Sequence, residues 1–195
     1  MRNIVLLTGL LVLCIANFVS AASLNSAQKI GIVVITADST FKTKQFNDKS
    51  KEAFKGMAKN LEVFNGDAVQ SKYDDYWLEK GLLEEGKPTK EDFISFVSFG
   101  EYDKVIYLLV RDVVIDGQGE GGVGIASPLG NTTVYSNTGG TGANLTVRAF
   151  LCDKNKVVKT VSVTRDTGQG NEFASKLIAF KRCVKSISED FKSAI

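Results

Sequence analysis

The apolar positions of this chain follow a strand period in some segments and a helix period in others. A continuous run of mostly β-branched residues, Lys29 to Thr36, is typical of a central strand that is covered on both faces. Ala143 to Cys152 instead alternates, which predicts a strand with two unlike faces. One face holds Leu145, Val147, Ala149 and Leu151, and the other holds Thr146, Arg148 and Phe150. Further strands are expected over 61–64, 104–115 and 157–165.

Apolar residues at steps of three and four predict helices between these strands. The longest stripe consists of Phe173, Leu177, Phe180, Val184, Ile187, Phe191 and Ile195. Shorter helices are expected over 48–60, from Asp67 to Gly81 and from Thr89 to Gly100. Asp67 with Gln70, and Thr89 with Asp92, have the spacing of a capping box, so each pair predicts a helix start.

The order of these elements indicates a single α/β (α+β) domain. Strand–helix units come first, and an antiparallel meander with a turn at 153–156 comes second. An amphipathic helix at the C-terminus is expected to pack on the resulting mixed sheet.

The first 22 residues have the layout of a secretory signal peptide. Met1 to Asn3 is charged, 4–15 is almost entirely apolar, and small residues follow up to Ala22. The apolar stretch is shorter than the roughly 20 residues that a spanning helix needs. We therefore expect residues 23–195 to form one exported domain, in the periplasm or outside the cell. A short membrane anchor is the alternative, and lipidation of Cys14 would also tether the domain, although Leu13 occupies a place where a small residue is usual.

Composition narrows the chemistry that this domain can perform. The chain has 195 residues, a formal charge of +2 and 44% hydrophobic residues, as a globular protein does. Its basic residues do not gather into a nucleic-acid footprint, so no nucleic-acid partner is expected. It has no histidine, which excludes a Ser-His-Asp site and a His-ligated zinc site. We predict no catalytic residue, no cofactor and no metal.

Two cysteines, Cys152 and Cys183, remain after the predicted signal peptide. Exported proteins meet oxidising conditions, so these two can form a disulfide that joins the last helix to the sheet. Two separate buried thiols are the other reading of the same pair.

The segment 116–142 is rich in glycine and poor in core residues. Gly117 to Gly122 contains a G-x-G-x-x-G pattern, but no helical pattern follows it, so a dinucleotide site is not expected. An exposed excursion that carries binding is one interpretation, with Asn131 and Tyr135 as contact residues. A plain connection is the other.

Tyr73 to Lys80 combines aromatic and acidic residues. A glycosidase uses two carboxyls that face one bond, whereas Asp74 and Asp75 are neighbours that point in different directions on a helix. Trp77 is expected to be a packing anchor, or a partner contact if it is exposed.

Three segments together resemble a known family. They are Lys29-Ile30-Gly31-Ile32-Val33-Val34, the run from Gly100 to Tyr107, and the run from Leu145 to Asp153 that turns into Lys156-Val157-Val158. Their order resembles bacterial envelope domains of the curli-secretion lipoprotein type and the amino-terminal domain of the Tol-system propeller protein. The resemblance implies a non-enzymatic α/β domain used for assembly or protein contact, with no catalytic residues.

The leading hypothesis is therefore an exported, non-catalytic protein of the bacterial envelope that binds another protein or envelope component. A carboxylate-dependent hydrolase of envelope glycans and a small-ligand binding module are the alternatives.

Overall fold

The structure is a computed structural model that describes residues 27–81, 88–115, 142–167 and 171–195. The predicted signal peptide, with Cys14, lies outside these ranges. So do Asn131, Tyr135, the G-x-G-x-x-G pattern and the rest of the glycine-rich segment up to residue 141.

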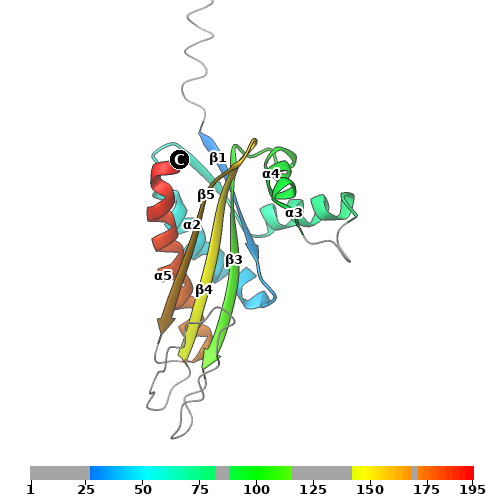
Figure 1. The fold of residues 1–195 in the computed structure, drawn as a ribbon. Helices are drawn as coiled ribbons and strands as arrows, with labels where there is room; N and C mark the ends of the chain where they lie inside the picture. Colours follow the sequence, from blue (N-terminus) through cyan, green and yellow to red (C-terminus); the bar gives the residue numbers. More distant parts are fainter. Residues whose placement is uncertain (1–26, 82–87, 116–141, 168–170) are drawn as a thin grey trace, which may run out of the picture.

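The described strands form one five-stranded mixed sheet in the order β2-β1-β3-β4-β5 (Figure 1). Their bounds are β1 Gln28–Ile35, β2 Leu61–Phe64, β3 Lys104–Ile115, β4 Gly142–Asp153 and β5 Val157–Thr167. β1 runs parallel to both β2 and β3, whereas β3, β4 and β5 are successively antiparallel. The predicted division into strand–helix units and a later meander is thus confirmed.

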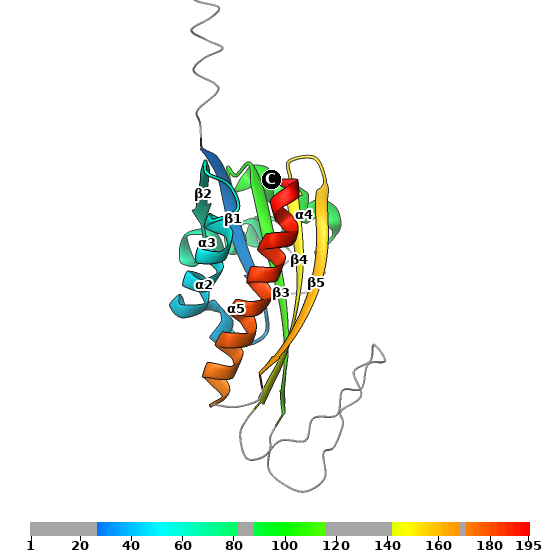
Figure 2. The ribbon, with the colours of Figure 1, turned by 90° about the vertical axis from the view of Figure 1, so that its left-hand side faces the viewer.

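Helices cover the two faces of this sheet in pairs (Figures 1 and 2). One pair is α2, Lys44–Lys55, and α5, Glu172–Phe191, with the short 3-10 helices η1, Ser39–Lys42, and η2, Lys192–Ala194, at their ends. The other pair is α3, Asp67–Glu79, and α4, Lys90–Phe99. We call the side of α2 and α5 the closed face and the side of α3 and α4 the half-covered face.

The core under the closed face is aliphatic and rich in phenylalanine. Sheet residues that point this way include the predicted set Leu145, Val147, Ala149 and Leu151, all fully buried. Phe180 of α5 meets Phe41 and Phe46, with ring centroids 5.9 and 5.2 Å apart. The last helix therefore packs across the sheet as its apolar stripe predicts, and Ala179 and Cys183 join that stripe.

The core under the half-covered face is built mainly from aromatic rings. Tyr73, Tyr76 and Trp77 of α3 and Phe96 of α4 are buried against Tyr107 of β3. The Tyr107 hydroxyl donates to the Phe93 carbonyl oxygen at 2.7 Å, so its polar end is satisfied inside the cluster. Two short helices bury a large apolar area here because each ring contributes so much surface.

Helix starts agree with the sequence in one case and differ in two. Thr89 and Asp92 form the predicted capping box at α4. The prediction for Asp67 is wrong, because Gly66 is the N-cap of α3 and Asp67 is its first helical residue. Gly66 has φ +69°, a backbone conformation that glycine adopts without strain. α2 begins at Lys44, four positions before the predicted Asp48.

Candidate functional site

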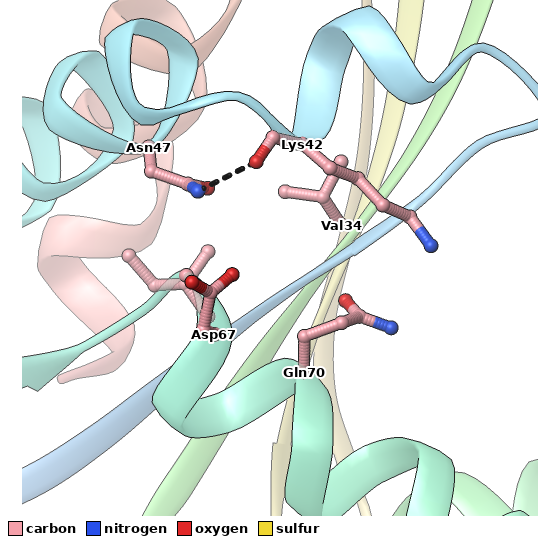
Figure 3. Close-up of a pocket in the computed structure, with 7 residues that line it drawn as sticks. Val34, Lys42, Asn47, Asp67 and Gln70 are labelled. Carbon is pink, nitrogen blue, oxygen red and sulfur yellow. Dashed lines mark hydrogen bonds between the residues drawn. The ribbon is translucent and has the colours of Figure 1, made fainter.

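A small hollow lies where β1 and β2 end and α3 begins (Figure 3). Its volume is about 80 Å³, and it is lined by Ile32, Val34, Lys42, Asn47, Gly66, Asp67 and Gln70. Sites for drug-sized ligands usually measure about 300 Å³ or more. The hollow has room for a few water molecules and no larger guest.

The chemistry of this hollow is structural. The Asn47 amide donates to the Lys42 carbonyl oxygen at 2.9 Å, which fastens η1 to α2. Asp67 is the one carboxylate among the lining residues, so the hollow does not offer the paired carboxyls that a glycosidase uses. Within the described ranges, no three His, Cys, Asp or Glu side chains gather closely enough to hold a metal ion.

A partly buried ion pair ties the segment that follows β1 to the start of α5. The Lys176 ammonium lies 2.7 Å from a carboxylate oxygen of Asp38 and 2.7 Å from one of Glu172. The hydrogen bond from Lys176, together with one from Thr40, lowers the pKa of Asp38 from 3.8 to about 2. This cluster clamps the two segments together.

Beyond the row that Tyr107 and Phe150 form across β3 and β4, no helix of the described residues covers this face of the sheet. Phe93 of α4 covers that row, with ring centroids 4.7 Å from Tyr107 and 6.1 Å from Phe150. In both views α3 and α4 stand near one end of the sheet, while β3, β4 and β5 run on past them (Figures 1 and 2). No other described element lies on that side of the three strands.

We call this bare region the open sheet face. Strand register places its residues in rows, since alternate residues share a face. It comprises Leu109, Arg111, Asn144, Thr146, Arg148, Ser162, Thr164 and Asp166. Arg111, Arg148, Ser162, Thr164 and Asp166 are exposed, and the other three are partly buried.

The open sheet face combines two guanidinium groups with hydroxyls, and it carries one carboxylate, Asp166, in its outermost row. Arg111 is opposite Thr146, and Arg148 lies two residues farther along the same strand. Neither arginine forms an ion pair with a described residue. Arg148 instead rests on the Phe150 ring, 5.1 Å from its centroid, and the hydroxyls of Thr146 and Thr164 hydrogen-bond at 3.0 Å. Such a surface is prepared to receive carboxylates.

The outer face of α3 has the opposite charge. Val69, Tyr73 and Tyr76 turn toward the sheet, so helical periodicity turns the other side outward. That outer face comprises Asp67, Ser71, Asp74, Asp75 and Leu78, all exposed. Its Leu78 side chain is 64% exposed, the highest value among the exposed large hydrophobic residues of the described chain.

Trp77 is the packing anchor that the sequence predicts, and it is not an exposed contact residue. Its exposed fraction is 7%, and its ring meets those of Tyr73 and Tyr76 at centroid distances of 5.5 and 5.1 Å. Its position on α3 turns it toward the sheet.

The predicted disulfide between Cys152 and Cys183 is also wrong. Both residues are free, buried thiols. Cys152 belongs to the aromatic core and Cys183 to the closed-face core, so the sheet lies between them. The alternation of side chains along β4 explains why the two thiols are on opposite faces. Leu145 and Leu151 face α5, so Cys152 points to the other side of the sheet.

The sequence gives part of the signal for the open sheet face. Alternation places Thr146 and Arg148 on one side of β4, as observed. Arg111 lies in an otherwise apolar run, and only the register of β3 against β4 brings it beside them. The sequence predicts the lengths of α3 and α4, but it does not predict where on the sheet the two helices lie.

The solved structures that this chain is similar to include two bacterial lipoproteins. The crystal structure of lipoprotein GNA1162 from Neisseria meningitidis has 12% sequence identity and a TM-score of 0.43, over 85% of this chain and 99% of that chain. A minor lipoprotein from Acinetobacter baumannii has 11% identity and a TM-score of 0.27, over 86% of this chain and 91% of that chain. With TM-scores below 0.5, neither likeness identifies a function.

Neither a protein-family profile nor a curated protein matches the chain. The resemblance to curli-secretion and Tol-system domains therefore stays a prediction. Among the described residues, no helix combines the length and apolar character that crossing a membrane requires.

Proposed function

We propose that this protein is an exported accessory of the bacterial envelope that works by holding another protein, and not by catalysis. The observation that carries the proposal is the half-covered face. It presents two arginines without a carboxylate partner on the open sheet face and, on the same side of the molecule, the carboxylates of α3. Complementary charges across an interface raise the association rate and the specificity, so exposed charges that no described residue pairs suit contact with a second macromolecule.

The sequence supports the envelope location. The layout of residues 1–22 is that of a signal peptide, and the order of segments resembles envelope domains used for assembly. The small hollow beside α3 does not compete with this role, because its volume of about 80 Å³ is too small for an organic substrate.

Site-specific photo-cross-linking in intact bacteria tests the proposal. The full chain is expressed with a photo-reactive residue in place of Ser162 on the open sheet face. The matched control carries the same residue in place of Lys185, which is exposed on α5. Cells are then fractionated, and adducts are identified by mass spectrometry.

We expect the protein in the envelope fraction and one reproducible protein adduct, either a second copy or another envelope protein, from position 162 and not from position 185. Equal adduct patterns at the two positions, or a protein that remains in the cytosol, contradict the proposal.

A further inference from the structure

The half-covered face is complementary to itself. α3 and α4 stand on one part of the face, and the described helices leave the open sheet face beside them uncovered (Figures 1 and 2). We infer that the open sheet face is the docking site for α3 of a second copy of this chain, in a two-fold symmetric dimer. This inference rests on the proposed function, since it names the protein that the surface holds.

Charge complementarity selects this occupant. The open sheet face offers the guanidinium groups of Arg111 and Arg148, and the outer face of α3 offers Asp67, Asp74 and Asp75. The Asp74 carboxylate is bonded within its own helix only by the Gln70 amide, at 3.0 Å. In such a dimer, α3 of each copy lies over the arginines of the other, so the aspartates and the arginines of both copies would be paired.

Shape and apolar contact agree with the same arrangement. α3 has 13 residues, which makes it about 20 Å long. The open rows of β3 to β5 cover about 10–15 Å in each direction, given strand spacings near 4.8 Å and a rise near 3.4 Å per residue. Leu78, exposed in the monomer, would meet the partly buried Leu109 at the end of the open sheet face nearest α4.

Two-fold symmetry follows from where the two surfaces lie. Both are on the half-covered face, so one rotation that brings these faces together engages both contacts at once. Such an isologous arrangement closes at two copies, whereas a head-to-tail contact would continue into a ring or a filament.

The test uses the protein purified from cells that express the full chain, in the form that the cells make. Sedimentation equilibrium and light scattering give the mass of the wild type and of two charge-reversal variants. One variant, Arg111→Glu with Arg148→Glu, reverses the sheet side. The other, Asp74→Arg with Asp75→Arg, reverses the helix side. Lys181→Glu with Lys185→Glu on exposed positions of α5 is the matched control.

We expect twice the monomer mass for the wild type and the control, and a dissociation constant raised at least about tenfold in each reversal variant. Raising the salt from about 0.05 to about 0.5 M should also weaken the wild-type dimer, because charges are then screened within a few ångströms. An equimolar mixture of the two reversal variants should regain the dimer mass, since each reversed helix then meets a reversed sheet.

A wild type that stays monomeric at about 0.1 mM, a concentration at which even weak specific dimers form, overturns the inference. A mixture that does not regain the dimer mass also overturns it. Circular dichroism and urea unfolding of each variant separate lost contact from lost folding. If the protein is monomeric while position 162 still cross-links to another envelope protein, the self-association fails and the proposed function stands. If position 162 gives no specific adduct, both fail.

Discussion

The two faces of the sheet differ both in their side chains and in how far helices cover them. On the closed face, α2 and α5 lie along the sheet over aliphatic strand residues, and five fully buried phenylalanines fill the space between. On the half-covered face, α3 and α4 cover one end with interlocking aromatic rings, and the remaining rows of β3 to β5 are polar. Along β4, the residues on the closed face are buried and apolar as far as Leu145, whereas the next residue, Thr146, lies on the other face opposite Arg111.

The two faces of the sheet therefore have different roles: the closed face mainly stabilises the fold, and the open sheet face is available for contact. Burial of apolar area is the main favourable term in folding, so the continuous closed face carries most of it. The aromatic cluster is compact enough to hold α3 and α4 without covering the whole sheet. The rows left bare are therefore open to changes in sequence that alter binding without loss of the fold.

Truncation of a closed-face ring should have the largest effect on stability. Phe180 is 0% exposed and contacts two other phenylalanines, so Phe180→Ala leaves a cavity. We expect it to lower the free energy of unfolding by about 3–5 kcal/mol, measured by urea denaturation. Phe150→Ala, at the edge of the aromatic cluster, should lose less than half as much because its ring is only partly buried. Equal losses would contradict the division between the faces.

A smaller loss should follow from crowding the aromatic face. A Cβ added at Gly100 would lie 2.5 Å from the Tyr102 ring, closer than atoms approach without a shift. Gly100→Ala should therefore cost about 1–3 kcal/mol of unfolding free energy. Gly56→Ala is the control, since nothing lies within 4 Å of its added Cβ. If the loss at Gly100 is unchanged when Tyr102 is also replaced by alanine, the ring is not its cause.

The clamp between β1 and α5 should make the closed face sensitive to acid. The folded pKa of Asp38, about 2, lies below its usual 3.8. Its contribution is therefore complete above about pH 4 and is lost as the pH falls toward 2. Over that window the wild type should lose about 1–2 kcal/mol more unfolding free energy than Asp38→Asn. Lys176→Met should flatten the profile in the same way, and a wild-type slope in either variant would contradict this account.

The smallest expected effect is a difference between the alkylation rates of the two cysteines. Each rate measures how readily one face of the sheet opens. Burial raises the pKa of the Cys152 thiol to about 12 and that of Cys183 to about 11, so neither reacts readily in the folded protein. Both should accept an alkylating label after unfolding without any reducing agent. Under native conditions Cys152 should label first, because α3 and α4 can detach while the closed face persists. Labelling is followed by mass spectrometry, and equal labelling rates for the two cysteines under native conditions would show that both faces open together.

Local signals in the sequence were sufficient for most of the elements. β2 and β3 have the predicted bounds, and β4 and α5 have the predicted buried sides, because alternation and helical steps reflect burial directly. The N-cap of α3 was predicted one residue too late. The spacing of Asp67 and Gln70 is that of a capping box, but the backbone of Gly66 takes the cap position, and Asp67 is the first helical residue.

Long-range placement was the part that could not be read from single segments. Cys152 lies on a strand and Cys183 on a helix that packs on it, which suggested a bridge. Whether the two side chains meet depends on which face that helix covers. The open sheet face likewise depends on the register of three strands and on how far α3 and α4 reach. Those features arise only when the segments pack together.

The position of β3 between a parallel and an antiparallel neighbour has a consequence for the order in which the protein folds. β4 and β5 are joined by a short turn in which the Asp153 carboxylate accepts hydrogen bonds from the Asn155 and Lys156 amides, so this hairpin needs only local encounters. The pairing of β1 with β3 brings Lys29 to Asp103 across 74 residues. Distant pairing is slow, so β1, the first strand synthesised, completes its pairing late. Its β-branched run is then the segment of the described chain that most needs protection from aggregation while the rest of the protein is made.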